Sequence, residues 1–240
     1  AFGFGDDQPR GIGMEDLVYT PPAYEPQHWK GSTLGQTFMM PFWWTSRTFV
    51  IPTYRQCEPE PPYTYSTDPN SAYYKDVEEV YNASFDPAKV DIGRYWANNP
   101  GLSGSPAGSW IGIANQLVDQ YNLDLPTTLR MYVFLSVSTR DAFIAAWYTK
   151  YKYNLERPVT YIRDVMGHTN WNSPVPTPPY PDYISGTSIN AGSSSEILTE
   201  LFGFKAFEDG QHADKGFGVR SFSNFKEAGI QAYNSRVFGG

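Results

Sequence analysis

The sequence predicts a mainly α-helical fold, a helical bundle that carries an extended N-terminal arm. Prolines and aromatic residues recur through residues 1–70, and from residue 71 onward apolar residues recur at helical spacing. No internal repeat and no strand-rich alternation of apolar and polar residues is evident. We therefore expect one domain, in which an arm over residues 1–70 packs on a bundle core over residues 71–240.

Composition limits the kinds of partner. The 240 residues are 40% hydrophobic, 17% aromatic and 18% charged, which is the composition of a globular protein with a large aromatic content. A formal charge of −7 and the lack of a basic stripe argue against nucleic-acid binding. The most apolar stretch is interrupted by Arg130, Arg140 and Asp141, so no transmembrane segment is expected. Any anion site must therefore be local.

Two short features favour a secreted or extracellular location. Asn82 lies in the N-glycosylation acceptor pattern Asn-Ala-Ser, and the chain begins with Ala1 in place of Met, as processed chains do. The single cysteine, Cys57, cannot form an internal disulfide, so cysteine usage does not identify the redox compartment.

The arm is expected to be extended and to lie against the bundle. Its prolines, in stretches such as YTPPAYEPQHWKG and CEPEPPYTYSTDP, exclude long helices and remove hydrogen-bond donors from a sheet. Trp29, Trp43 and Trp44 are too apolar to remain in water without cost.

Helices are expected in order along the core. The first covers SAYYKDVEEVYN, and Asp86 caps a second that begins with Pro87. Ser109 is the expected cap of a third helix with apolar residues at helical spacing. The central helix, from about Pro126 to Tyr153, is apolar nearly all round and should lie inside a bundle.

Two further helices follow a second proline-rich stretch. Pro158 is expected to end whatever helix precedes it. The loop NWNSPVPTPPYPDY then leads into a helix that ends at Gly203, and residues 220–236 are expected to form the last helix.

Three segments carry groups that suit an anion. Lys150 and Arg157 supply two positive charges, and Arg236 supplies a third near the end of the chain. Ser185 and the backbone N–H of Gly186 supply neutral donors at a helix start, where the helix dipole also favours an anion. A tetrahedral oxyanion suits this mixture of guanidinium groups, a point charge and short donors. Taken singly, each residue is more often an ordinary helix-end residue.

The order of these residues resembles a known signature. Lys-x6-Arg-Pro, then Ser-Gly after a proline-rich loop, then Ser-Arg-x3-Gly is similar to the three-part signature of the vanadium-dependent haloperoxidases and the type 2 phosphatidic acid phosphatases. The haloperoxidase-like branch is closest, in DAFIAAWYTKYKYNLERPVTYIRD, TPPYPDYISGTS and RSFSNFKEAGIQAYNSRVFGG. The resemblance extends from the proline-rich arm, through SAYYKDVEEVY and PAGSW, to the last residue.

The resemblance implies a helical bundle of the haloperoxidase type and an oxyanion site. It assigns vanadate or phosphate binding to Lys150, Arg157, Ser185, the Gly186 amide and Arg236. It implies no other metal-ion ligands.

The catalytic histidines that the resemblance implies are missing. In the family an acid–base histidine follows Ser-Gly, but this chain has Thr187, whose hydroxyl has no pKa near neutrality. A second histidine follows the last arginine in the family, whereas this chain stops at Gly240 before that place. The acidic residue usual after the tryptophan of AAW is Tyr148 here. No catalytic residue is therefore intact.

Other titratable residues are not expected to replace them. His28, His168 and His212 lie in predicted loops, where histidines are mostly solvated surface residues. Glu156, beside Arg157, is interpreted as a salt-bridge partner in preference to a general acid.

Two functions are compatible with these observations. The first is a haloperoxidase-like or acid phosphatase-like protein that retains the oxyanion pocket but is weak or inactive as this chain alone. The alternative is a pseudoenzyme subunit that assembles with other chains and binds an apolar ligand such as a pigment. The 18 Tyr, 15 Phe and 7 Trp favour the alternative because such side chains suit interfaces, although a well-filled core would also explain them.

The domain is expected to be incomplete by itself. A central helix that is apolar all round needs cover on every side, and the resemblance ends inside the third motif. We expect one piece of a longer precursor, covered by other polypeptide segments in an obligate, oligomeric assembly. Arg236 lies four residues before Gly240, and a terminal carboxylate there would compete with an anion for the guanidinium groups. The sequence leaves open whether Gly240 is the true terminus.

Overall fold

The structure is a computed structural model, and it describes residues 18–31, 38–98 and 104–239. The expected arm is therefore described in two parts, and Gly240 lies outside the described residues. In chain order the helices are α1 (Ala72–Ala83), α2 (Pro87–Tyr95), α3 (Pro106–Gln120), α4 (Leu125–Tyr153), α5 (Pro158–Asp164), α6 (Gly186–Phe202) and α7 (Phe225–Gly239). This order confirms a mainly α fold.

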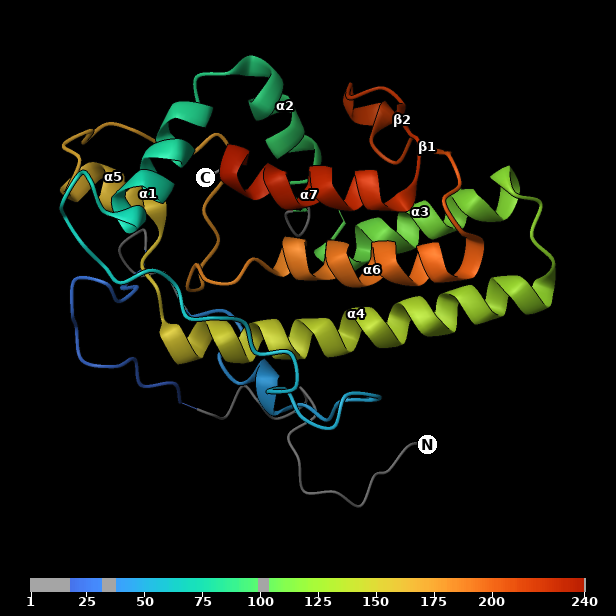
Figure 1. The fold of residues 1–240 in the computed structure, drawn as a ribbon, viewed down its shortest axis with the longest axis horizontal. Coiled ribbons are helices and arrows are strands. Elements are labelled where there is room, and N and C mark those ends of the chain that lie inside the picture. The colour runs from blue at the N-terminus through green and yellow to red at the C-terminus, as the bar shows by residue number, and fades with distance from the viewer. Residues whose placement is uncertain (1–17, 32–37, 99–103, 240) are drawn as a thin grey trace.

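The helices stack around α6. In Figure 1, α4 forms one long edge of the bundle, α6 lies beside it and α7 lies beside α6. Helix α3 packs against both α4 and α6, and α2 covers α7. The close approach of α6 and α7 requires Gly229, because a Cβ there would lie only 2.7 Å from the Ser195 Oγ atom.

Of two predicted helix N-caps, Asp86 is confirmed and Ser109 is wrong. Asp86 accepts hydrogen bonds from the amides of Ala88 and Lys89 and is followed by Pro87, as predicted. The predicted cap Ser109 is wrong: α3 begins four residues earlier, because the Ser105 hydroxyl accepts from the Gly108 amide. Ser109 is instead buried and bonds to Asn98.

The end of α4 brings the chain back on itself. Helix α4 stops at Asn154, which has left-handed backbone angles with φ of 45°. Pro158 then occupies the first position of α5, with Arg157 as its N-cap residue. Pro158 therefore opens a helix, and the helix before it ends earlier than the proline.

A small hairpin precedes the last helix. Strands β1 (Phe207–Asp209) and β2 (Arg220–Phe222) pair antiparallel, with Phe207 opposite Phe222 and both rings buried. A short 3-10 helix, η3 (Ala213–Lys215), lies between them. The prediction of helix from residue 220 is wrong for its first five residues, because α7 begins at Phe225 and a strand of three residues is too short to show alternation. Gly203 ends α6 as predicted.

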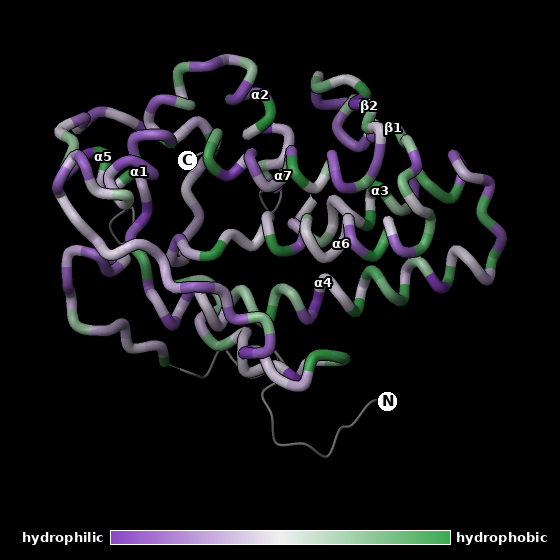
Figure 2. Tube along the Cα trace, viewed as in Figure 1, coloured by the Kyte–Doolittle hydropathy of each residue, from purple (hydrophilic) through white to green (hydrophobic). Residues whose placement is uncertain are grey.

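The core is aromatic and continuous between the helices. Buried apolar residues of α3, α4, α6 and α7 belong to one core cluster. Figure 2 shows hydrophobic and hydrophilic residues alternating along these helices. Trp96, Trp110 and Tyr95 are almost fully buried where α2 and α3 meet the hairpin.

The described parts of the arm pack on α4. Figure 1 shows the 3-10 helix η2 (Trp43–Thr45) of the arm on the side of α4 opposite α6. Trp43 meets Phe143 edge to face, and Trp44 meets Tyr148 in the same way. The buried Asp141 carboxylate accepts hydrogen bonds from three successive arm amides, those of residues 49–51, at 2.7, 2.7 and 3.1 Å. Asp141 thus anchors the arm.

One face of the N-terminal half of α4 is exposed in the described structure. Leu125, Leu129 and Val133 follow one another at intervals of four residues, and they are 69%, 55% and 56% exposed. The opposite face of this half is buried, since Met131 and Leu135 lie in the core with residues of α3 and α6. The expectation that further polypeptide segments cover the exposed face of α4 stays a prediction. The described helices include none with the length and apolar character needed to cross a bilayer.

The anchoring role of Asp141 leads to a stability prediction. Asp141→Ala leaves three amide donors without their acceptor, so the free energy of unfolding should fall by about 3 kcal/mol. Urea unfolding followed by tryptophan fluorescence measures this change. The matched control is Asp119→Ala, which removes an exposed carboxylate from α3 and should leave stability almost unchanged. Equal stabilities of the two variants would contradict the anchoring role.

Candidate anion-binding site

All the residues predicted to bind an anion line one cavity of about 350 Å³. It lies where the C-terminal ends of α4 and α7 meet the N-terminal end of α6 and the loop of residues 175–182. The predicted residues that line it are Lys150, Arg157, Ser185, Gly186, Thr187 and Arg236.

Local structure explains why these residues meet. Lys150 is on the last turn of α4, and the left-handed turn at Asn154 directs Arg157 back toward the same cavity. Ser185 is the N-cap residue of α6, and its hydroxyl accepts from the Ser188 amide at 3.1 Å. Gly186 lets the start of α6 approach α4, since a Cβ there would lie 3.1 Å from the Trp147 ring.

Lys150 is a buried cation held by backbone carbonyls. Its side chain is 1% exposed, and Nζ donates to the carbonyls of Pro181 and Asp182 at 2.9 and 2.6 Å. Burial lowers the pKa of Lys150 well below its ordinary value, and the neighbouring Arg157 lowers it further. The ammonium form therefore needs more negative charge than the protein supplies.

Arg157 has one arm of its guanidinium group without a partner. Its Nε atom donates to the Tyr180 carbonyl at 2.8 Å, and Nη1 pairs with Asp182 Oδ1 at 3.0 Å. Its Nη2 atom is buried and has no hydrogen-bond acceptor among the described residues. An unsatisfied buried donor of this kind is costly unless a ligand accepts its hydrogen bond.

Arg236 connects α7 to the end of α2. Its Nη2 atom donates to the carbonyls of Gly93 and Trp96, both at 3.1 Å, and Nε donates to Ser235 Oγ at 3.0 Å. Burial lowers the pKa of Arg236 to about 10, and Arg157 contributes to the same shift. The positive charge of Arg157 therefore destabilises the charged form of Arg236.

The cavity has more positive than negative charge. Among the described residues that line it, Asp182 is the one carboxylate against three basic side chains. The amides of Gly186 and Thr187, in the first turn of α6, make no hydrogen bond to any described residue. Free amides, a partnerless guanidinium arm and uncompensated positive charge fit an anion with several oxygen atoms.

Thr187 lies in the cavity wall, and the histidines do not. Thr187 is 7% exposed, at the place where the family resemblance implies an acid–base histidine. His28 contacts the Ala23 carbonyl, and His168 stacks on Tyr81. His212 packs against Tyr95 and is buried, which corrects its assignment as a solvated residue; burial lowers its pKa.

The sequence reasoning missed several lining residues. Asp182 is the only acidic residue in the loop before Ser185, and this isolated charge was the available signal. Phe143 and Trp147 stack with ring centroids 3.8 Å apart, and Lys150 Nζ lies 4.8 Å from the Tyr180 ring. These rings form an apolar wall that limits water around the cations.

The interpretation of Glu156 as a salt-bridge partner is wrong. Arg157 pairs with Asp182, whereas the Glu156 carboxyl forms no ion pair among the described residues and faces a different cavity. The separation arises because consecutive residues at the start of α5 point to opposite sides of the chain.

Comparisons with known proteins agree with this architecture. Residues 130–171 match the family model described as the VCPO second helical-bundle domain. The crystal structure of the first bacterial vanadium-dependent iodoperoxidase is 34% identical over 95% of this chain and 58% of that chain, with a TM-score of 0.88. No curated protein matches the sequence.

Two chloroperoxidase structures share the fold. The holo-type bacterial vanadium-dependent chloroperoxidase is 20% identical, with a TM-score of 0.72, over 95% of this chain and 62% of that chain. The apo-type structure is 17% identical, with a TM-score of 0.71, over 95% of this chain and 64% of that chain. This chain spans less than two thirds of the length of each of these three proteins.

Proposed function

Because the chain belongs to the vanadium haloperoxidase superfamily, we propose that its charged cavity binds a tetrahedral oxyanion, vanadate or phosphate. The observation that carries the proposal is the buried Nη2 atom of Arg157, which has no acceptor among the described residues in a cavity with excess positive charge. An oxyanion would accept this hydrogen bond and offset the charge.

The cavity residues fit such an anion in distinct ways. Arg157 and Arg236 would bind oxygen atoms through guanidinium N–H groups, and Lys150 would contribute a point charge. Ser185 and the amides of Gly186 and Thr187 would add short donors at the helix start. When bound, vanadate supplies the centre at which peroxide oxidises halide in haloperoxidases.

The site has no histidine to transfer protons among the described residues that line it. The Thr187 hydroxyl can donate or accept a hydrogen bond but has no pKa near neutrality with which to act as a general acid or base. No histidine lines the cavity in the described part of the chain. Loss of acid–base groups typically costs orders of magnitude in rate, so this chain alone is a weak or inactive haloperoxidase or phosphatase.

A second function is favoured by a different observation. An apolar cavity of about 490 Å³ lies between the arm, α4 and α6, with walls that include Ile51, Phe134, Ile189 and Ile197. It suits an apolar ligand, and the exposed apolar half of α4 suits covering segments from other chains. An absorption spectrum and an elemental assay for vanadium distinguish the two proposed functions. Visible absorbance without vanadium favours apolar-ligand binding, and bound vanadium favours oxyanion binding.

Vanadate binding should depend on the buried arginines. Arg236→Met removes one charge from the cavity wall, so the affinity for vanadate should fall roughly tenfold to hundredfold. Equilibrium dialysis with elemental analysis of vanadium measures the affinity. Arg94→Met, on the exposed surface of α2, removes the same charge and should leave the affinity unchanged. Equal affinities of both variants, with both folded by circular dichroism, would contradict the proposal.

Turnover should stay near background even when vanadate is bound. In the unmodified chain, given peroxide and iodide, Thr187 occupies the position at which the family resemblance implies an acid–base histidine, and no histidine is among the described residues that line the cavity. Spectrophotometric detection of oxidised iodide measures the rate. Substantial turnover by the unmodified chain, with no partner present, would show that the catalytic part of this proposal is wrong.

A further inference from the structure

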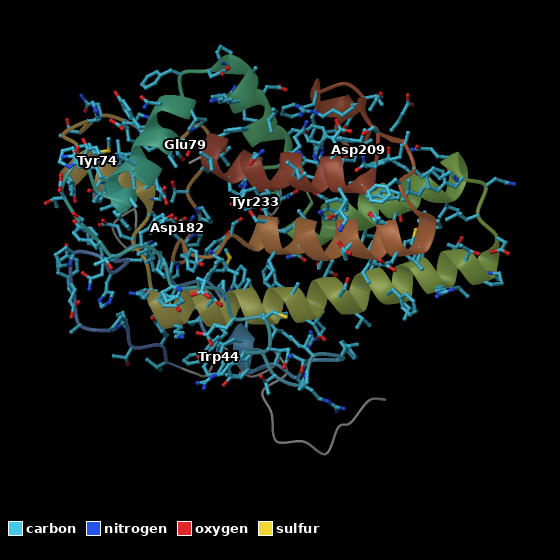
Figure 3. All side chains as sticks on the ribbon, viewed as in Figure 1. Trp44, Tyr74, Glu79, Asp182, Asp209 and Tyr233 are labelled. Atoms are coloured by element: carbon cyan, nitrogen blue, oxygen red, sulfur yellow. The ribbon has the colours of Figure 1, made fainter. Side chains whose placement is uncertain are left out.

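A second cavity, of about 380 Å³, lies on the other side of Asp182 from the anion-binding cavity. It is enclosed by α1, by the arm at residues 60–63 and by the turn between α4 and α5. Asp182, labelled in Figure 3 between α1 and α4, lines both cavities. The second cavity has no role in the oxyanion chemistry proposed above.

Glu156 is the buried polar group of this cavity. The residue is 5% exposed, and its carboxyl has no hydrogen bond or ion pair to any described residue, although its amide donates to the Gln27 carbonyl at 2.8 Å. Burial raises the pKa of Glu156 to about 7, while Lys30 opposes the shift and Asp164 adds to it. A carboxyl group that has little contact with water and no donor from the protein is a favourable partner for a ligand that donates to it.

The wall of this cavity is negatively charged, which favours a positively charged ligand. Glu60, Asp76, Glu156 and Asp182 are among the lining residues, and no Lys, Arg or His is among those described. Asp182 is already paired with Arg157. Burial also raises the pKa of Asp76, and the neighbouring Glu79 contributes to the shift. Uncompensated negative charge of this kind attracts a cation.

The remaining lining residues are aromatic and apolar, which favours a ligand with an apolar part. Tyr63, Tyr73 and Tyr183 line the cavity together with prolines and valines. Aromatic rings bind organic cations through their π faces as well as through apolar contact. The described residues contain no group of three or more carboxylate, histidine or cysteine side chains that could hold a metal ion. The walls therefore suit an organic cation better than a metal ion.

We propose that this cavity binds a small organic ammonium compound with an aromatic or aliphatic body. The ammonium group donates to the buried Glu156 carboxylate, and the body lies against Tyr73 and Tyr183. Glu60, Tyr63 and Asp76 are exposed and form the entrance, whereas Tyr73 and Glu156 are buried and form the base. Negative charge at the entrance would also attract the ligand.

The test uses benzylamine as the probe. Isothermal titration calorimetry of the purified protein at about pH 8 measures its affinity with Glu156 mainly ionised. Glu156→Gln should weaken binding roughly tenfold or more, because a neutral amide replaces a charged acceptor. Glu78→Gln makes the same change at an exposed position of α1 outside the cavity, and binding should be unchanged.

Two further measurements separate a cation site from a general apolar pocket. Benzyl alcohol, a neutral probe of similar shape, should bind at least tenfold more weakly than benzylamine. Lowering the pH through about 7 should weaken benzylamine binding, because Glu156 becomes protonated. The titratable and charged groups that face Glu156 or share its cavity are Lys30, Glu60, Tyr63, Tyr65, Tyr73, Asp76, Tyr161, Asp164, Asp182 and Tyr183.

The calorimetric results either support or overturn ammonium binding at Glu156. Weaker binding by Glu156→Gln, with Glu78→Gln unchanged, supports the proposal. If Glu156→Gln fails to fold, Asp76→Asn at the exposed entrance replaces it and should weaken binding a few-fold. No detectable benzylamine binding, equal binding of benzyl alcohol, or an affinity unaffected by these substitutions would overturn the proposal.

Discussion

The burial of three cations around one carboxylate is the constraint on which the site and much of its surroundings depend. Lys150, Arg157 and Arg236 are held by carbonyls of the proline-rich loop and of the end of α2, and Asp182 neutralises one of them. Buried charge is tolerated only when it is hydrogen-bonded and balanced. These bonds tie α2, α4, α5 and α7 together, so the charge that prepares the cavity for an anion also helps to fix the helices around it.

Asp182 separates two cavities of opposite charge. On one side it pairs with Arg157 in the cation-rich cavity, and on the other it lines the cavity that contains Glu156. An anion bound at the Nη2 atom of Arg157 would share the guanidinium charge with Asp182, which pairs with Nη1, and it would thereby leave more of the Asp182 negative charge uncompensated toward the second cavity. The geometry therefore allows a ligand in one cavity to alter affinity in the other.

Much of the fold and most of the residues that line the anion-binding cavity could be predicted from the sequence. The rest could not be predicted, for physical reasons. Helix starts with a strong local signal, such as Asp86 before Pro87, were predicted correctly. Ser105 is the correct cap of α3 in place of Ser109, and Pro106 directly after Ser105 was the available sequence signal, of the same kind as Pro87 after Asp86. Glu156 was misjudged because adjacency to Arg157 in sequence does not reveal that the two side chains line different cavities.

The central claim, that the buried cations are prepared for an oxyanion, is tested most directly by proton uptake on sulfate binding. Sulfate does not titrate between neutral and alkaline pH, so calorimetry over a series of pH values in that range, in two buffers of different ionisation enthalpy at each pH, reports protons taken up by the protein. Burial and Arg157 lower the pKa of Lys150, and a bound anion should raise it again, so sulfate binding should be accompanied by proton uptake that Lys150→Met abolishes. Sulfate binding without proton uptake, or no binding in this cavity, would contradict the account.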